Sequence, residues 1–185
     1  MNALETLDKY ISTARALGTD VRLSAPSAFR GELKAFLKSE GFRIAALQEA
    51  GWPEDLFSDI KAALREAGTT VAGPGSDGKA FSGMAAAEVG ITFAEHFIAE
   101  TGSMALPSGP GRLTAASLLP AVHIAVGYSS GVSANLGELL TSLKEEMPSR
   151  LTLVTGPSRT GDIEASMTVC VHGPGRVLHY LLTEG

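Results

Sequence analysis

Helix-like and strand-like segments alternate along the first 72 residues, and this alternation constrains the fold more than any other feature of the chain. Apolar residues recur at helical spacing in three stretches, and each stretch ends at a glycine. The three glycines are Gly18, Gly41 and Gly68. Short apolar stretches typical of strands follow at residues 21–23, 42–47 and 69–72. Because parallel strands need a crossover connection, which is nearly always right-handed, the pattern predicts an α/β fold with an open, mostly parallel, helix-covered sheet.

The rest of the chain adds further strand-like segments and one more helix. The strand-like segments are residues 89–92, 98–106, 123–126, 151–154 and 177–182. A leucine-rich apolar face predicts a helix from about residue 133 to residue 146, with the Ser133 hydroxyl as its N-cap. The turn-forming residues at 73–78 are too few for a domain linker. A length of 185 residues suits one domain, so we expect a single α/β domain over residues 1–185.

Charge and cysteine content exclude several classes of partner and site. Acidic residues outnumber basic ones, 20 to 15, and the basic residues are scattered, so we expect no nucleic-acid partner. Cys170 alone forms no internal disulfide and no cysteine cage for zinc or an iron–sulfur cluster, and we assign no metal site. No apolar run approaches the roughly 20 residues of a membrane span, and the N-terminus lacks the basic residues of a signal peptide. We therefore expect a cytoplasmic protein.

Residues 156–164 combine turn formers, hydroxyls and both signs of charge, and His172 and Gly173 follow closely. Glycines such as Gly156 allow backbone paths that aim successive N–H groups into one concavity, and Ser158, Arg159 and Thr160 add donors at its rim. The stretch therefore predicts an anion-binding loop, in which the planar fork of Arg159 holds a carboxylate or a phosphate.

Two further residues near this loop have alternative roles. Asp162 either orients Arg159 or caps the first turn of a short helix. His172 either carries a proton or contacts the ligand, because imidazole titrates near neutrality, or it braces the loop. Of the other histidines, His123 is expected in the core, and His96 and His179 are expected to be partly exposed.

A second polar cluster lies between apolar residues at Glu100, Thr101, Gly102 and Ser103, which indicates a strand end or a tight bend. We expect the Glu100 carboxylate to be partly shielded there; partial burial would disfavour its ionised form, which would suit an acid, a base or an acyl-accepting nucleophile. The alternative is a carboxylate that hydrogen-bonds the turn. Ligands of open α/β sheets bind outside the carboxyl ends of strands, so the loops after Ile98 and Val154 are expected to converge on one ligand.

Five blocks of residues occur in an order that resembles the LutC/YkgG proteins of the LUD (lactate utilisation) domain family. The blocks are Gly90–Thr92, Ile98–Gly102, Leu119-Pro120 with His123-Ile124, Gly156–Thr160 with Asp162–Glu164, and His172–Pro174. The chain departs from the family pattern at Cys170, where the family usually has glycine. The resemblance implies a fold of the NagB/RpiA/CoA-transferase-like type. It also implies a role in oxidising L-lactate to pyruvate alongside iron–sulfur partner subunits.

Three hypotheses about function follow. In the first, the chain is a LutC-like subunit that binds a small acid near Glu100, the loop around Arg159, and His172. In the second, it is a free-standing enzyme on acyl-CoA or sugar-phosphate substrates, with Glu100 as nucleophile or base. In the third, it is a non-catalytic interaction subunit whose polar loops form an interface. No flavin, nicotinamide or iron–sulfur motif is present in the sequence, so we assign no cofactor to this chain and expect iron–sulfur clusters on its partners.

Overall fold

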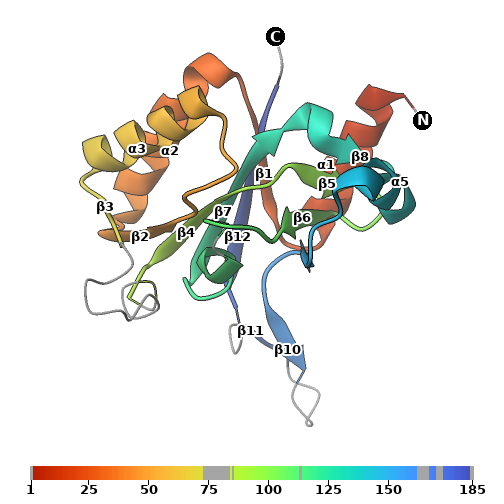
Figure 1. Ribbon diagram of the computed structural model, residues 1–185. Coiled ribbons are helices and arrows are strands. Elements are labelled where there is room, and N and C mark those ends of the chain that lie inside the picture. Colours follow the sequence, from red (N-terminus) through yellow and green to blue (C-terminus); the bar gives the residue numbers. More distant parts are fainter. Residues whose placement is uncertain are drawn as a thin grey trace.

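The computed structural model describes residues 2–72, 84, 86–112, 114–161, 167–169 and 173–183. Its centre is a six-stranded sheet in which every neighbouring pair of strands is parallel (Figure 1). The strand order is β1-β12-β7-β4-β2-β3. The bounds are β1 Asp20–Ser24, β2 Ile44–Leu47, β3 Thr70–Val71, β4 Val89–Phe93, β7 Val122–Tyr128 and β12 Arg176–Leu182. The predicted α/β class and the mostly parallel sheet are confirmed.

Helices cover both faces of this sheet. Helices α2 (Pro26–Glu40) and α3 (Glu54–Ala67) share one buried cluster with Leu178 and Tyr180 of β12. Helix α1 (Ala3–Ala16) covers the opposite face, where it packs with Val177 and Leu181. Because residues alternate across a strand, β12 is apolar on both faces, as a central parallel strand must be.

The glycines predicted to end the first helices lie at those ends. Gly41 and Gly68 are the left-handed C-caps of α2 and α3, and Gly18 follows α1 with φ +92°. At the start of α1, Asn2 Oδ1 accepts a hydrogen bond from the Glu5 backbone N–H, and the Glu5 carboxylate accepts one from the Asn2 N–H. This reciprocal capping box satisfies N–H groups that have no partner inside the helix.

A second, four-stranded sheet with the order β8-β5-β6-β9 packs beside α1. Its strands are β5 His96–Ile98, β6 Ser103–Pro107, β8 Val132–Ser133 and β9 Leu151–Val154. A two-stranded hairpin of β10 (Arg159–Gly161) and β11 (Met167–Val169) projects away from both sheets (Figure 1). Short 3-10 turns are η1 Thr114–Ser117, η2 Ser129–Gly131 and η3 Lys144–Glu146.

Two sequence predictions differ from the observed elements. The single strand expected at residues 98–106 is an antiparallel pair, because residues 99–102 turn the chain between β5 and β6. The helix expected from residue 133 is shorter: α5 spans Leu136–Ser142, and its N-cap is Asn135, whose Oδ1 accepts from the Glu138 N–H at 3.0 Å. Ser133 lies instead in β8, so its expected role as the cap is wrong.

Two histidines lie inside the parallel sheet. His123 is fully buried, as expected, but the expected partial exposure of His179 is wrong, because its side chain is 0% exposed. The Tyr10 hydroxyl and His179 Nδ1 share a hydrogen bond of 2.6 Å, and Thr92 Oγ1 and His123 Nε2 share one of 2.9 Å. Burial lowers the pKa of both imidazoles to about 3.

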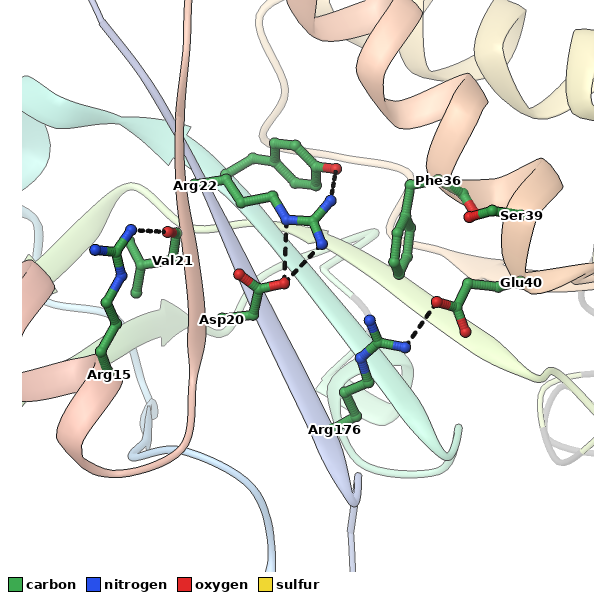
Figure 2. Close-up of polar contacts among 9 residues, drawn as sticks. Arg15, Asp20, Val21, Arg22, Phe36, Ser39, Glu40 and Arg176 are labelled. Atoms are coloured by element: carbon green, nitrogen blue, oxygen red, sulfur yellow. Dashed lines mark hydrogen bonds and ion pairs between the residues drawn. The ribbon is translucent and has the colours of Figure 1, made fainter.

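Strand β1 is an edge of the parallel sheet; Arg15 reaches its open side, whereas Arg22 lies on the side of the neighbouring strand β12 (Figure 2). Arg15 Nη2 donates to the Val21 carbonyl at 2.7 Å. Arg22 donates to the Asp20 carboxylate and, at 3.0 Å, to the Tyr180 hydroxyl. Charged side chains on an edge strand oppose pairing with another chain.

Among the described residues, no helix combines the length and the apolar character that crossing a bilayer requires.

Candidate functional site

The two polar turns predicted from the sequence meet at the C-terminal end of α1. A Cβ atom on Gly102 would lie 2.7 Å from the Ala14 nitrogen, and one on Gly156 would lie 3.0 Å from the Leu17 carbonyl oxygen. Both glycines also have positive φ, +64° and +72°. Backbone approach this close, in this conformation, requires glycine. The end of α1 therefore holds both turns in place.

A chain of hydroxyl groups connects the same two turns. Thr101 Oγ1 lies 2.8 Å from Ser103 Oγ, which in turn lies 2.6 Å from Thr155 Oγ1. Ser103 is buried, whereas Thr101 and Thr155 are exposed. Strands β6 and β9 pair at Met104 and Val154, which brings the residues beyond them together. The two loops therefore lie side by side.

A hollow of about 410 Å³ lies beside the second turn, and we call it the loop hollow. Four residues predicted to bind a ligand line it: Gly156, Ser158, Arg159 and Gly173. Leu17 and Thr155 also line it and were missed by the sequence reasoning. Nothing in the sequence links the end of a helix at Leu17 to a loop near residue 156.

The Arg159 guanidinium lies against the end of α1. Its Nη2 donates to the Leu17 carbonyl at 3.1 Å, and a Cβ on Gly18 would lie 3.0 Å from the same nitrogen. A cation at a helix C-terminus is favourable, because the unpaired carbonyls there carry partial negative charge. The side chain is exposed, and a guanidinium has five N–H donors, so capping leaves capacity for a bound anion.

The backbone of the loop offers fewer donors than expected. The Ser158 N–H donates to the Pro174 carbonyl at 2.8 Å, which ties the loop to the segment that precedes β12. That N–H is therefore committed within the protein. Thr160 pairs with Thr168 in the hairpin. Asp162, Cys170 and His172 lie outside the described residues.

Glu100 differs most from its prediction. Its side chain is exposed, so the expected shielding of the carboxylate is wrong. The reason is the turn at residues 99–102: Ala99 is buried, and Glu100 and Thr101 are exposed to water at its tip. Glu100 does not line the loop hollow, and among the described residues it forms no ion pair with Arg159.

The expected position of these loops relative to the main sheet is also wrong. Strands β5 and β9, which precede the two loops, belong to the second sheet and not to the parallel one. The carboxyl edge of the parallel sheet instead carries Gln48, Glu95 and Tyr128, which the sequence did not predict as site residues.

Within the described part of the chain, no three His, Cys, Asp or Glu residues are grouped as metal ligands.

Comparison with known proteins gives concordant results. The family model of the LUD domain matches residues 29–182. "Lactate utilization protein C" of Halalkalibacterium halodurans is 35% identical over 104 residues, which cover 53% of this chain and 45% of that protein. The protein of the same name from Bacillus subtilis (strain 168) is 33% identical over 104 residues, covering 53% and 43%. "Uncharacterized protein YkgG" of Escherichia coli (strain K12) is 29% identical over 144 residues, covering 75% and 59%.

A solved structure has the same fold. A DUF162 family protein from Deinococcus radiodurans superposes with a TM-score of 0.71 at 19% identity, over 98% of this chain and 99% of that chain. The curated relatives are longer than the region of similarity, and the chain spans about half the length of those it matches.

Proposed function

This chain belongs to the LUD domain family, and from that premise we propose that it is a LutC-like lactate utilisation protein. In this proposal it is a subunit without iron–sulfur clusters that supports oxidation of L-lactate to pyruvate and binds a small carboxylate in the loop hollow. The observation that carries the proposal is its similarity to relatives named lactate utilization protein C.

The chemistry of the loop hollow supports a small acid as its ligand. Arg159 presents an exposed guanidinium at the hollow, and Ser158 and Thr155 line it with hydroxyl groups. A guanidinium binds a carboxylate through two parallel N–H···O bonds, a geometry that lysine cannot reproduce. Leu17 and Leu118 add apolar lining, which suits the short carbon chain of a hydroxy or keto acid.

The electrons of lactate oxidation require a redox cofactor, and the proposal assigns it to partner subunits. The sequence has one cysteine, which cannot supply the set of thiolates that an iron–sulfur cluster needs. The chain would therefore contribute binding and assembly to a complex whose partners carry the clusters.

Growth and ligand binding together test this proposal. Deletion of the gene should abolish growth on L-lactate, and the wild-type gene should restore it. With the purified protein, L-lactate or pyruvate at 100 times its dissociation constant should add about 2.7 kcal/mol of apparent stability. Arg159→Ala and Arg159→Lys should both lose this gain, and Arg65→Ala on α3 should keep it. Normal lactate growth after deletion, with no substitute protein present, contradicts the proposal.

One observation favours the interaction-subunit alternative. Three leucines beside the loop hollow are exposed, Leu118 by 46%, Leu119 by 49% and Leu153 by 43%. Clustered exposed apolar side chains mark surfaces that bind other proteins. If the chain is an interaction subunit only, Leu118→Asp with Leu119→Asp should release the iron–sulfur partners during co-purification. In that case no acid tested should shift the melting temperature of the wild-type protein.

A further inference from the structure

A second site lies at the carboxyl edge of the parallel sheet, beside the ends of β4 and β7. These two strands are parallel neighbours, so their carboxyl ends lie side by side. In open α/β sheets, ligands bind outside the carboxyl ends of the strands. The residues at these two ends, Phe93 to His96 and Tyr128, therefore lie where a ligand is expected.

A hollow of about 410 Å³ opens at this edge, and we call it the sheet-edge hollow. Its lining includes a carboxylate, an imidazole, a phenol and a seryl hydroxyl, from Glu95, His96, Tyr128 and Ser133. Phe93 adds an aromatic ring, whose centroid is 6.2 Å from that of Tyr128 in an edge-to-face arrangement. A concave, partly aromatic hollow with a few polar groups has the size and composition of a small-molecule site.

Glu95 is held in place by a second layer of contacts. Arg112 Nη2 lies 2.6 Å from Glu95 Oε1, and the two side chains are only 21% and 31% exposed. The guanidinium lies against Gly51, where a Cβ would be 2.8 Å from Arg112 Cζ and where φ is +88°. The loop after β2 thus fixes Arg112, and Arg112 fixes the carboxylate of Glu95, a lining residue.

The surroundings of His96 favour its neutral form. Partial burial lowers its pKa below 6.5, and the neighbouring Arg112 charge acts in the same direction, while Glu95 opposes both. A neutral imidazole has one nitrogen that accepts a hydrogen bond. Glu95 and His96 therefore offer acceptors on one side of the hollow, and Tyr128 and Ser133 offer hydroxyls that donate or accept.

The balance of charge selects the class of ligand. The described lining contains no lysine or arginine, and the nearby Arg112 is already paired with Glu95. An anion would face the Glu95 carboxylate without a free cation to pair with, and that costs binding energy. A molecule with several uncharged hydroxyls meets an acceptor or a donor at each polar group. Its C–H faces can pack on Phe93 and Tyr128.

We propose that the sheet-edge hollow binds an uncharged polyhydroxylated molecule, a sugar or a polyol, whose hydroxyls donate to Glu95 and His96 and accept from Tyr128. Arg112 is a positioning residue that acts through Glu95. This site is separate from the loop hollow and its acidic ligand, so the two proposals succeed or fail independently.

The chain contains its own reporter for this test. Trp52 is the one tryptophan in the sequence, and its ring centroid is 5.3 Å from that of Phe93, which lines the hollow. Trp52 fluorescence is therefore titrated with D-glucose, D-ribose, glycerol and myo-inositol, and in parallel with L-lactate and ribose 5-phosphate. A saturable change is expected with at least one neutral compound at millimolar concentration and with neither anion.

Single substitutions test whether the change in Trp52 fluorescence comes from binding in this hollow. Glu95→Gln and Tyr128→Phe should each weaken binding about tenfold, since each removes one good hydrogen-bonding group. Arg112→Ala should abolish binding, and Arg112→Lys should restore part of it, because lysine can still pair with Glu95. Tyr128→Phe removes a single hydroxyl, so it keeps the test valid if a change at Glu95 or Arg112 prevents folding.

The control is Glu40→Gln, which breaks a comparable ion pair of 2.8 Å with Arg176 at a remote surface (Figure 2). It should leave the affinity unchanged. The proposal is overturned if no neutral compound gives a saturable signal, if the anions bind as well as the neutral compounds, or if Glu95→Gln and Tyr128→Phe bind like the wild type.

Discussion

At the scale of single residues, the core contains two buried imidazoles, those of His123 and His179, which must stay neutral in the folded protein. His123 Nδ1 and His179 Nε2 have no hydrogen-bond partner among the described residues, and both rings are fully enclosed. A charged imidazole in such surroundings has neither water nor a counter-ion, so folding holds both rings neutral. The free energy of unfolding therefore depends on pH, because the two rings bind protons more readily in the unfolded chain than in the folded one.

The stability of the protein should therefore fall in mild acid. The unfolded chain binds protons at these histidines below pH 6.5, whereas the folded chain resists protonation until its pKa of about 3. The contribution is fully present above pH 6.5, and below it each histidine lowers the free energy of unfolding by about 1 kcal/mol per pH unit. Urea unfolding between pH 7 and pH 5, above the range of most carboxyl groups, measures this slope. His179→Gln should reduce it to about half; a flat profile for the wild type contradicts the account.

Glu100 should behave as an ordinary surface carboxylate. Because water reaches it in the turn between β5 and β6, it lacks the shielding that would activate a nucleophile. Incubation with acyl-CoA thioesters should leave the intact mass of the protein unchanged, and Glu100→Gln should change stability by no more than about 0.5 kcal/mol. A covalent acyl adduct that is present in the wild type and absent from Glu100→Gln would instead support the free-standing enzyme.

At the scale of elements, the sequence predicted the helix ends that depend on the conformation of a single residue. Gly41 and Gly68 mark the ends of α2 and α3, because a left-handed C-cap favours glycine whatever packs around it. The second sheet was not predictable in this way. Strands β6 and β9 pair although about 45 residues separate them in the sequence. The residues of a strand do not show which other strand it pairs with. For the same reason the sequence identified Gly156 and Arg159 but not Leu17, which the fold brings beside them.

Gly102 should be essential to the junction between the β5–β6 turn and α1. An alanine Cβ would lie 2.7 Å from the Ala14 nitrogen, and the backbone there has φ +64°. Gly102→Ala should therefore destabilise the fold by about 1–3 kcal/mol, as strained backbone positions do. Chemical denaturation measures the loss.

Gly31 supplies the matched control. It lies inside α2, and a Cβ there would meet no atom within 4 Å. Gly31→Ala should stabilise the protein by up to about 1 kcal/mol, because alanine favours the helix. Equal effects of the two substitutions would mean that the contact with α1 contributes nothing.

At the scale of the whole molecule, β1 is one of the two edge strands through which the parallel sheet could pair with another chain. Parallel strands expose unpaired N–H and C=O groups at an edge, and a second chain can pair with them. Here Arg15 reaches from α1 to occupy the Val21 carbonyl, and the Arg22–Asp20 pair places charge along the same strand (Figure 2). The helix that carries Arg15 also supports the loop hollow, so one element protects the edge and positions the candidate site.

Removal of the Arg15 side chain should favour self-association through β1. Arg15→Leu frees the Val21 carbonyl and replaces a charge with an apolar group at an edge strand whose Leu23 is already 48% exposed. Light scattering at increasing concentration should show a larger average mass for this variant than for the wild type. Arg65→Leu, which also exchanges an arginine for leucine but on α3, away from this edge, should scatter like the wild type. If Arg15→Leu scatters like Arg65→Leu at every concentration, the edge is protected by other means, and β1 needs no cover from α1.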